Sequence, residues 1–262
     1  MNTKTALITG ASTGIGKEFA KIHASKGENL VIVARNEEKL FQLKNELEHQ
    51  YKIEVIVITK DLSQPNASKE IYENVKNLGI EIDYLINNAG FGGLGKFHER
   101  ALEDDLAMIN LNIVALTILT RLFLTDFVNK NSGKILNVSS TASLMPGPLQ
   151  AVYFATKAYV TSFSNAIAEE LHDTNVTVTA LLPGATETEF GRISGMEKTA
   201  MFKKTASAYS VALDGYNGMM AGKIDVISGL TLSQKIMMAG IPFSPKKMIL
   251  KQIRKMQEVK NA

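Results

Sequence analysis

The chain has 262 residues, of which 45% are hydrophobic, and a formal net charge of +3. This length suits one α/β domain, and the interspersed charges indicate neither a nucleic-acid-binding face nor an acidic tail. The chain contains no cysteine, which excludes disulfides, thiolate catalysis and cysteine-ligated metal sites.

Two further patterns bear on the membrane and on targeting. The amino terminus enters an apolar strand pattern at Thr5–Thr9 without the charged and apolar regions of a signal peptide. The most apolar stretch, Ile113–Leu124, is interrupted by Arg121 and is shorter than the roughly 20 residues that a membrane-spanning helix needs. We therefore expect no transmembrane segment and a cytoplasmic location.

Short β-branched runs alternate with longer helical patterns along the chain. Strands are expected at Ala6–Thr9, Leu30–Ala34, Glu54–Thr59, Tyr84–Asn87, Lys134–Val138 and Val176–Leu182, with a weaker one at Asp225–Ile227. Helices are expected at Ile15–Lys26, Glu37–His49, Ala67–Leu78, Leu102–Asn129 and Val152–Leu171. The strands are near-continuous apolar runs, as in parallel sheets that helices cover on both faces. The alternation predicts a single doubly wound, Rossmann-type α/β domain over residues 1–262, with a mostly parallel seven-stranded sheet.

A glycine-rich turn follows the first strand and opens directly into the first helix. It reads Gly10-Ala11-Ser12-Thr13-Gly14-Ile15-Gly16. Glycines keep such a turn tight, and the free N–H groups and dipole at the amino end of a helix attract phosphate. Ligands of doubly wound sheets bind beyond the carboxyl ends of the strands, where this turn lies. The turn predicts dinucleotide binding, and a purely structural turn is the alternative.

Together with Thr9, this turn is similar to the Thr-Gly-x-x-x-Gly-x-Gly motif of the short-chain dehydrogenase/reductase family. Further matches follow in chain order at Asn87-Asn88-Ala89-Gly90, Ser140, Tyr153 with Lys157, and the segment from Pro183 to Thr188. The resemblance covers residues 5–190 and implies that a cofactor pyrophosphate lies across the turn. It also implies that Asn88, Ala89 and Gly90 lie close to the cofactor.

The residues after the second strand bear on the choice of cofactor. Ala34 stands where an NAD-preferring site needs a carboxylate for the ribose 2′-hydroxyl, and Arg35 offers a guanidinium suited to a 2′-phosphate. NADP(H) is therefore expected to be preferred over NAD(H), with Ser12 and Asn36 as helpers.

The resemblance implies cofactor contacts after two other strands. Asp61 and Leu62 match the family's contact with the adenine edge, and a turn or helix cap is an equal alternative for Asp61. Pro183, Gly184, Thr186 and Thr188 match the segment that wraps the nicotinamide end, Thr186 through its backbone and Thr188 through its hydroxyl.

Tyr153 and Lys157 lie four residues apart in a helical pattern, so their side chains project from one helix face. A neighbouring ammonium lowers the pKa of a phenol, here toward the range of efficient general acid–base catalysis. Tyr72 and Lys76 share this spacing but lie in a polar segment that is expected to be a solvated helix face. Tyr153 differs because Ser140 stands 13 residues upstream, the family's separation for its substrate-binding serine.

The family places an asparagine in the long apolar helix, where it interrupts the backbone hydrogen bonds and holds a water that leads to the lysine. Two asparagines, Asn110 and Asn112, lie inside the expected helix. Matching the run Ile113–Thr120 to the family's helix favours Asn112, and Asn110 is the alternative.

These matches imply an oxidoreductase that transfers hydride between NADP(H) and a carbonyl or alcohol, with Asn112, Ser140, Tyr153 and Lys157 as catalytic residues. An α/β-hydrolase would need a Gly-x-Ser-x-Gly elbow, which Ser140 lacks, and no His-Glu-x-x-His pattern indicates a metal site. A non-catalytic nucleotide sensor on the same fold is the main alternative, although we would expect a sensor to have lost the Ser, Tyr or Lys.

Beyond Phe190 the family match fades, and residues 186–262 are expected to form a substrate lid and a C-terminal extension. Apolar side chains in this segment and beside the expected cleft suggest a hydrophobic carbonyl or alcohol as substrate, with core or interface residues as the alternative: Phe91, Leu144, Met145, Leu149, Phe190, Met196, Met201 and Phe202.

The basic amphipathic pattern over Ser244–Val259 predicts a helix that packs on the body or on another subunit, with a membrane surface as the alternative. Family members usually associate through the long helices that correspond to Leu102–Asn129 and Val152–Leu171. Small residues on the second of these, namely Ala155, Ala158, Ser162 and Ala166, would permit close helix approach. We therefore expect a homodimer or homotetramer.

Overall fold

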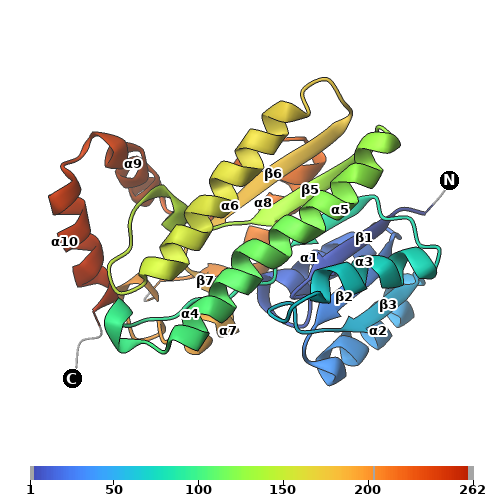
Figure 1. Ribbon diagram of the computed structural model, residues 1–262, viewed down its shortest axis with the longest axis horizontal. Coiled ribbons are helices and arrows are strands. Elements are labelled where there is room, and N and C mark those ends of the chain that lie inside the picture. The colour runs from blue at the N-terminus through green and yellow to red at the C-terminus, as the bar shows by residue number, and fades with distance from the viewer. Residues whose placement is uncertain (1–2, 203, 259–262) are drawn as a thin grey trace.

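The computed structural model describes residues 3–202 and 204–258 (Figure 1). Its main sheet consists of β1 (Thr5–Thr9), β2 (Asn29–Ala34), β3 (Val55–Thr59), β4 (Tyr84–Asn87), β5 (Gly133–Val138), β6 (Val176–Pro183) and β9 (Asp225–Ser228). The strand order is β3-β2-β1-β4-β5-β6-β9, and each of these neighbouring pairs is parallel. The predicted seven-stranded Rossmann-type sheet is confirmed.

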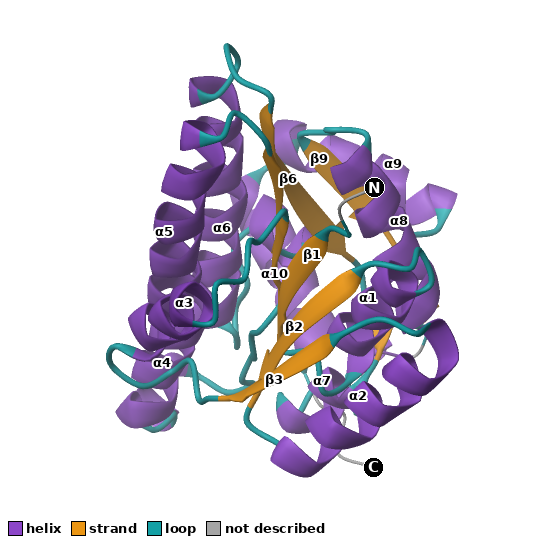
Figure 2. Cartoon of the chain, turned by 90° about the vertical axis from the view of Figure 1, so that its right-hand side faces the viewer, coloured by secondary structure: helices purple, strands orange, loops and turns teal. Residues whose placement is uncertain are grey.

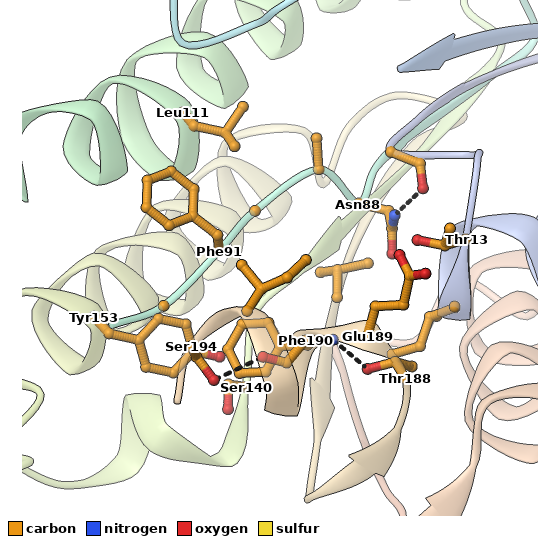
Figure 3. Close-up of a pocket in the computed structure, with 18 of the residues that line it drawn as sticks. Thr13, Asn88, Phe91, Leu111, Ser140, Tyr153, Thr188, Glu189, Phe190 and Ser194 are labelled. Carbon is orange, nitrogen blue, oxygen red and sulfur yellow. Dashed lines mark hydrogen bonds between the residues drawn. The ribbon is translucent and has the colours of Figure 1, made fainter. Parts of the chain in front are cut away.

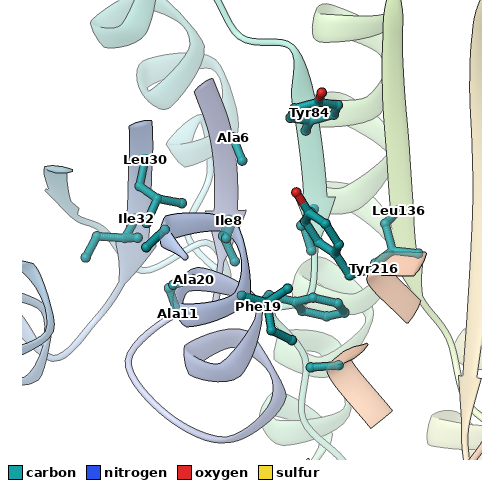
Figure 4. Close-up of a cluster of buried hydrophobic side chains, with 14 of the residues drawn as sticks. Ala6, Ile8, Ala11, Phe19, Ala20, Leu30, Ile32, Tyr84, Leu136 and Tyr216 are labelled. Atoms are coloured by element: carbon teal, nitrogen blue, oxygen red, sulfur yellow. The ribbon is translucent and has the colours of Figure 1, made fainter. Parts of the chain in front are cut away.

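Helices cover both faces of this sheet (Figure 2). One face carries α1 (Gly14–Ala24), α2 (Glu37–Tyr51) and α8 (Ala208–Met220), and the other carries α3 (Ala67–Asn77), α4 (Leu102–Ile109), α5 (Leu116–Asn129) and α6 (Ala151–Glu170). On the first face, Phe19 of α1 and Tyr216 of α8 pack against Ile8 and Leu136 of the sheet (Figure 4). Both faces of the strands are therefore buried, which explains why their sequences are continuous apolar runs.

The order of the strands reverses between β1 and β4, which are neighbours although β2 and β3 separate them in the chain. Loops diverge to opposite faces at such a point and leave a crevice at the carboxyl ends of the strands. The glycine turn after β1 and the Asn88-Ala89-Gly90 segment after β4 lie side by side at this crevice.

The long apolar helix is continuous from Leu102 to Asn129 and includes a π-helical turn at Asn110–Ala115. It has 28 residues and is long and apolar enough to cross a membrane by length and composition, so the expectation that no run is long enough was wrong. Core helices of soluble proteins pass the same test, and here Phe123 and Phe127 pack in the core on one face of the sheet.

Residues after β6 contribute both to the main sheet with its covering helices and to smaller elements outside that sheet. Helix α8 and strand β9 complete the body, whereas β7 (Thr186–Glu187) pairs with β8 (Ala206–Ser207) and α7 (Glu189–Ile193) follows β7. The last described helices are α9 (Leu232–Gly240) and α10 (Lys246–Gln257). The predicted tail helix therefore exists, although Val259, its expected end, lies outside the described residues.

Candidate active site

A cavity of about 1240 Å³ lies at the carboxyl ends of the strands. It brings together nineteen of the predicted residues: Gly10, Ser12, Thr13, Gly14, Ile15, Arg35, Asn36, Asp61, Leu62, Asn88, Ala89, Gly90, Ser140, Tyr153, Lys157, Pro183, Gly184, Thr186 and Thr188. Gly16 and Asn112 are absent from its lining and lie behind the wall. Residues from six separate loops therefore converge on one space.

The glycine turn has the shape that a phosphate cradle requires. Gly10 and Gly14 have φ of +67° and +55°, a backbone conformation that residues other than glycine rarely adopt. A Cβ on Gly10 would lie 2.8 Å from Asn88 Nδ2, and one on Gly14 would lie 2.9 Å from Thr188 Cγ2. Gly16 packs against the Gly10 carbonyl in the same way.

The amino end of α1 is open to an anion. Its N-cap residue Thr13 makes no side-chain capping hydrogen bond, so the N-cap does not supply an acceptor for the first amide N–H groups of the helix. Thr13, Gly14 and Ile15 all line the cavity. The turn and the helix end together fit the pyrophosphate of a dinucleotide.

Asn88 ties the end of β4 to the end of β1. Its Nδ2 donates to the carbonyl oxygens of Thr9 (2.9 Å) and Gly10 (3.2 Å), and the backbone N–H groups of Asn88 and Ala89 donate to Thr9 Oγ1 at 3.0 Å. Figure 3 shows Asn88 beside Thr13 on the wall of the cavity. These bonds hold the strand ends that carry the glycine turn.

The end of the cavity at β2 and β3 is cationic. Arg35 is exposed there, and within the described residues its side chain makes no hydrogen bond or ion pair. Lys39 and Lys60, which the sequence analysis missed, line the same region and pair with Glu189 (2.9 Å) and Glu70 (2.6 Å). The positions of Lys39 and Lys60 in the sequence could have revealed them, because Lys60 directly follows β3 and Lys39 lies one helical turn after Arg35.

Two polar residues near Arg35 have structural partners. Asn36 caps α2, because its Oδ1 accepts from the N–H of Lys39 at 2.8 Å. Asp61 accepts from both the N–H (3.0 Å) and the hydroxyl (2.8 Å) of Ser63, so the turn reading of this carboxylate is correct. Both side chains also line the cavity, and their contacts with adenosine stay predictions.

Tyr153, Lys157 and Ser140 line the other end of the cavity. Figure 3 shows Tyr153 and Ser140 there beside Phe190. The Tyr153 ring lies 5.4 Å from the Phe190 ring between centroids. Lys157 Nζ donates to the carbonyl oxygen of Val138 at 2.8 Å and lies 5.9 Å from the Tyr153 ring centroid. Ser140 Oγ accepts from the N–H of Ala142 at 3.1 Å.

The predicted lowering of the Tyr153 pKa was wrong for this structure. Burial raises the pKa of the Tyr153 phenol to about 12, opposed by the side chain of Ser140. Burial also lowers the pKa of the Lys157 ammonium to about 8. The reason is that both side chains are buried, and loss of hydration disfavours the charged form of each. At neutral pH the phenol is therefore a proton donor.

Of the two candidate asparagines, Asn112 is the one at the site. Asn110 is exposed, whereas Asn112 is buried in the π-helical turn and exchanges hydrogen bonds with the Phe91 backbone (3.2 and 3.0 Å). A Cβ on Gly90 would lie 3.0 Å from Asn112 Oδ1 and 3.4 Å from Lys157 Nζ. Asn112 and Lys157 therefore flank Gly90, and the expected interruption of the helix is present.

The segment after β6 folds around its own hydroxyl groups. Thr186 Oγ1 donates to the Gly184 carbonyl at 2.9 Å. Thr188 caps α7, because its Oγ1 accepts from the N–H of Phe190 at 3.3 Å. The Pro183 carbonyl accepts from Thr141 Oγ1 at 3.2 Å. These bonds set the path of a loop whose contacts with nicotinamide stay predictions.

Tyr72 and Lys76, the second pair at the same spacing, lie elsewhere. The Tyr72 hydroxyl and Lys76 Nζ both contact the Asp126 carboxylate, at 3.0 and 3.2 Å to Oδ2. Neither residue lines the cavity. This pair links α3 to α5 on the surface, as expected for an ordinary helix face.

Apolar side chains line the cavity near Tyr153. Four of the predicted ones do so, namely Phe91, Phe190, Met196 and Phe202, together with Leu111 and Ile193, which had no motif to reveal them. Leu144, Met145 and Leu149 do not line it, and the side chain of Met201 lies outside the described part of the structure. This end of the cavity suits an apolar ligand.

Among the described residues, the geometry does not provide the side chains that a serine hydrolase or a metal site would need. None of the four histidines lines the cavity, so Ser140 has no histidine base there. Within residues 3–202 and 204–258, no group of three or more His, Asp or Glu side chains is arranged to hold a metal ion.

A parallel doubly wound sheet with a glycine turn, and a Ser, Tyr and Lys in the same cavity, is the arrangement typical of dinucleotide-dependent α/β oxidoreductases. Residues 4–198 match the model of the family described as short chain dehydrogenase. The chain belongs to this family, whose members act on CH–OH or C=O groups with NAD(P).

Relatives of known activity support this assignment. Human very-long-chain 3-oxoacyl-CoA reductase is 35% identical over 196 residues, which are 72% of this chain and 61% of the human protein. An NADP-dependent 3-hydroxy acid dehydrogenase from Schizosaccharomyces pombe is 35% identical over 195 residues, which are 72% of this chain and 74% of that protein. The chain thus spans less than two thirds of the human relative's length.

Solved structures match almost the whole chain. A 7β-hydroxysteroid dehydrogenase aligns with a TM-score of 0.86 and 26% identity over 96% of both chains. A short-chain dehydrogenase from Sphingobium yanoikuyae in complex with NADPH aligns with a TM-score of 0.82 and 28% identity, covering 98% of this chain and 99% of that one.

Proposed function

We propose that this protein transfers hydride between NADP(H) and an apolar carbonyl or alcohol, with Tyr153 as the general acid and base. The observation that carries the proposal is that Tyr153, Lys157 and Ser140 share one cavity with the glycine turn and Arg35. Such a cavity fits a dinucleotide with its reactive end beside a proton donor.

The cavity's residues suggest how NADPH is held. The turn from Gly10 to Gly16 and the amino end of α1 would hold the pyrophosphate, and Arg35, with Lys39 and Lys60 nearby, would hold the 2′-phosphate. Lys157 would hold the nicotinamide ribose. The bound cofactor supplies the hydride.

The protein's own task is to place the substrate oxygen and to move its proton. The high pKa of Tyr153 keeps its phenol protonated, ready to donate to the oxygen as negative charge develops. Ser140 Oγ accepts from Ala142, and its contact with the Pro183 carbonyl is long at 3.5 Å, so its proton is available to the same oxygen. The Lys157 charge stabilises the phenolate that remains, and Asn112 would anchor the water that returns the proton.

The apolar lining near Tyr153 supports an apolar substrate. Phe91, Leu111 and Phe190 present aromatic and aliphatic surface to the cavity (Figure 3). The relatives named for 3-oxoacyl-CoA, 3-hydroxy acids and hydroxysteroids suggest ketones and 3-oxoacyl esters as the first compounds to assay.

Tyr153→Phe tests the proposal. The variant keeps the ring packing against Phe190 but removes the proton, so we expect NADPH affinity to change little and turnover to fall by about 100-fold or more. Turnover is measured by NADPH oxidation with a panel of ketones, aldehydes and 3-oxoacyl esters. Tyr72→Phe is the matched control, since it removes the same hydroxyl at the same Tyr-x-x-x-Lys spacing, and it should retain wild-type turnover.

Two results would count against this function. A Tyr153→Phe variant that keeps most of the activity would disprove the role of the phenol. Wild-type protein that binds NADPH tightly but reduces none of the panel, and oxidises none of the corresponding alcohols with NADP⁺, would favour a non-catalytic nucleotide sensor.

A further inference from the structure

The last 28 described residues form a helical hairpin at one end of the molecule. It comprises α9, the short 3₁₀ turn Ile241–Phe243 and α10, and we call residues 231–258 the C-terminal hairpin. Figure 1 shows α9 and α10 at the end of the molecule opposite strand β3. No part of the proposed chemistry uses its outer surface.

Helix α10 presents two different faces. Ile249, Ile253 and Gln257 follow one another at four-residue spacing, and they point toward the body: Ile249 and Ile253 pack in the apolar cluster that contains Tyr153, and Gln257 Oε1 accepts from Gln150 at 2.9 Å. Lys247, Lys251 and Lys255 repeat at the same spacing and are exposed. Because two residues correspond to a rotation of about 200°, this lysine row lies on the opposite, outer face.

The rest of the hairpin exposes large apolar side chains. In α9, Leu232 and Ile236 share one helix face and are 75% and 67% exposed. Phe243, in the turn between the helices, is 90% exposed, and Met248 at the start of α10 is 56% exposed. A water-facing helix does not gain stability from such side chains, so this surface is suited to a partner that is itself apolar.

The charges of the hairpin are strongly asymmetric. It holds six of the chain's 29 Lys and Arg residues but only one of its 26 Asp and Glu residues, Glu258. The remainder of the chain carries slightly more acidic than basic residues. The positive charge of the protein is therefore concentrated beside its most exposed apolar side chains.

We propose that the C-terminal hairpin docks on the surface of an anionic phospholipid membrane. Leu232, Ile236 and Phe243 would enter the boundary between headgroups and acyl chains, and the lysine row would bind the anionic headgroups, so apolar burial and charge attraction act together as they do for interfacial helices. A second copy of the hairpin is a poorer partner, because a two-fold contact would bring like charges together.

This docking has a consequence for the position of the active site. Ile249 and Ile253 join α10 to the cluster that contains Tyr153, Phe154 and Phe190. The membrane-facing hairpin therefore adjoins the apolar end of the cavity, and an apolar substrate dissolved in the bilayer would have a short path to it. The docking itself does not depend on the proposed reaction.

Flotation of the full-length protein with vesicles tests the proposal. We expect binding to equimolar phosphatidylcholine and phosphatidylglycerol but little to phosphatidylcholine alone, and release at about 1 M NaCl, where the Debye length is about 3 Å. Changing Lys247, Lys251 and Lys255 together to Gln should lower the partition coefficient on the order of 100-fold, given roughly a fivefold effect for each charge. Changing Leu232, Ile236 and Phe243 together to Ser should also abolish binding.

Matched triple variants on the body serve as controls. Lys26, Lys69 and Lys223 are exposed, so their replacement by Gln removes the same charge elsewhere and should leave vesicle binding unchanged. Phe41, Leu78 and Ile224, which are also exposed, provide the same control for the apolar set. Thermal unfolding and NADPH binding show that each variant is folded.

Three outcomes would overturn the docking. One is a wild-type protein that stays with the soluble fraction for both lipid compositions. Another is an equal loss of binding in the hairpin and control lysine variants, which would mean a nonspecific charge effect. The third is a wild type that does not bind vesicles together with a hairpin variant that light scattering shows to dissociate into smaller species. That result would assign the hairpin to a contact between subunits.

Discussion

Arg35 is the residue on which the proposed cofactor preference depends. Its guanidinium is exposed at the cavity and makes no ion pair within the described residues, and Ala34 leaves no carboxylate to repel a 2′-phosphate. We expect Arg35→Ala to raise the KM for NADPH about 10- to 100-fold, the range for loss of a charge-assisted hydrogen bond. The KM for NADH should change little, so measuring both constants with one substrate isolates the 2′-phosphate.

Lys69→Ala is a suitable control for Arg35→Ala, because Lys69 is an exposed cation that does not line the cavity. It should leave both constants unchanged. An Arg35→Ala variant whose KM values for NADPH and NADH rise equally would contradict the assignment, since that result would mean a general loss of cavity structure.

Lys157 should leave a signature in the pH dependence of stability. Its pKa of about 8 in the folded protein lies below the ordinary 10.5, so between these values the unfolded chain binds more protons and the folded state gains stability as the pH rises. We expect the free energy of unfolding of wild type, relative to Lys157→Met, to increase by up to about 3 kcal/mol from pH 8 to 10.5. Urea denaturation of both proteins measures this difference.

Two observations make the Lys157 comparison interpretable. The Tyr153 pKa is raised to about 12 by burial, so its opposite effect begins above pH 10 and is present in both proteins. Lys76→Met is the control, because its partner Asp126 raises the Lys76 pKa and its contribution is lost only above 10.5. A flat difference for Lys157→Met up to pH 10.5 would show that Lys157 is hydrated in the folded protein.

At the scale of the elements, strands and helices up to residue 183 were predictable because local pattern and burial agree. Strand β4 was predicted at its observed limits, α2 and α3 begin at the predicted residue and end within two residues of the predicted end, and α6 differs by one residue at each end. Each of these elements keeps the same pattern of burial along its length, so the spacing of its apolar residues predicts the element well. The motif after each strand could then be assigned to one edge of the sheet.

Helix α8 was missed because its sequence argues against a helix. Gly215 and Gly218 both lower helix propensity, and their reason is tertiary: a Cβ on Gly215 would lie 2.7 Å from Leu181 Cδ2, and Gly218 packs against Val226. Close packing of α8 on the sheet thus overrides local preference. Such a contact joins segments that are distant in the chain, and no local pattern records it.

The site was predictable in its residues but not in its electrostatics. Ser140, Tyr153 and Lys157 converge as their spacing predicted, whereas the direction of the Tyr153 pKa shift did not follow. Side-chain spacing reports which groups are neighbours. Desolvation depends on everything packed around them, here Phe154 and Phe190 among others, so the sequence could not decide which effect is larger.

At the scale of the whole molecule, two exposed surfaces among the described residues suit a partner, and they lie on different elements. One is the C-terminal hairpin. The other is the outer face of the long helices, where α5 and α6 lie side by side (Figure 2) and are joined by the 3.0 Å contact between the hydroxyls of Thr117 and Tyr159. Val114 and Tyr159 are 42% and 37% exposed there, which is apolar surface that a second subunit would cover.

The small residues of α6 make this face suitable for helix packing. Ala155, Ala158, Ser162 and Ala166 are all exposed, so a partner helix can approach the backbone closely. We expect wild type to be a dimer or tetramer in light scattering, and Ala158→Arg to shift it to monomers, since a guanidinium in a two-fold contact brings a like charge against itself. Ala221→Arg adds the same side chain at an exposed position on the end of α8 and should leave the assembly intact. A monomeric wild type would contradict the assignment, and an Ala158→Arg variant that stays assembled would move the interface away from α6.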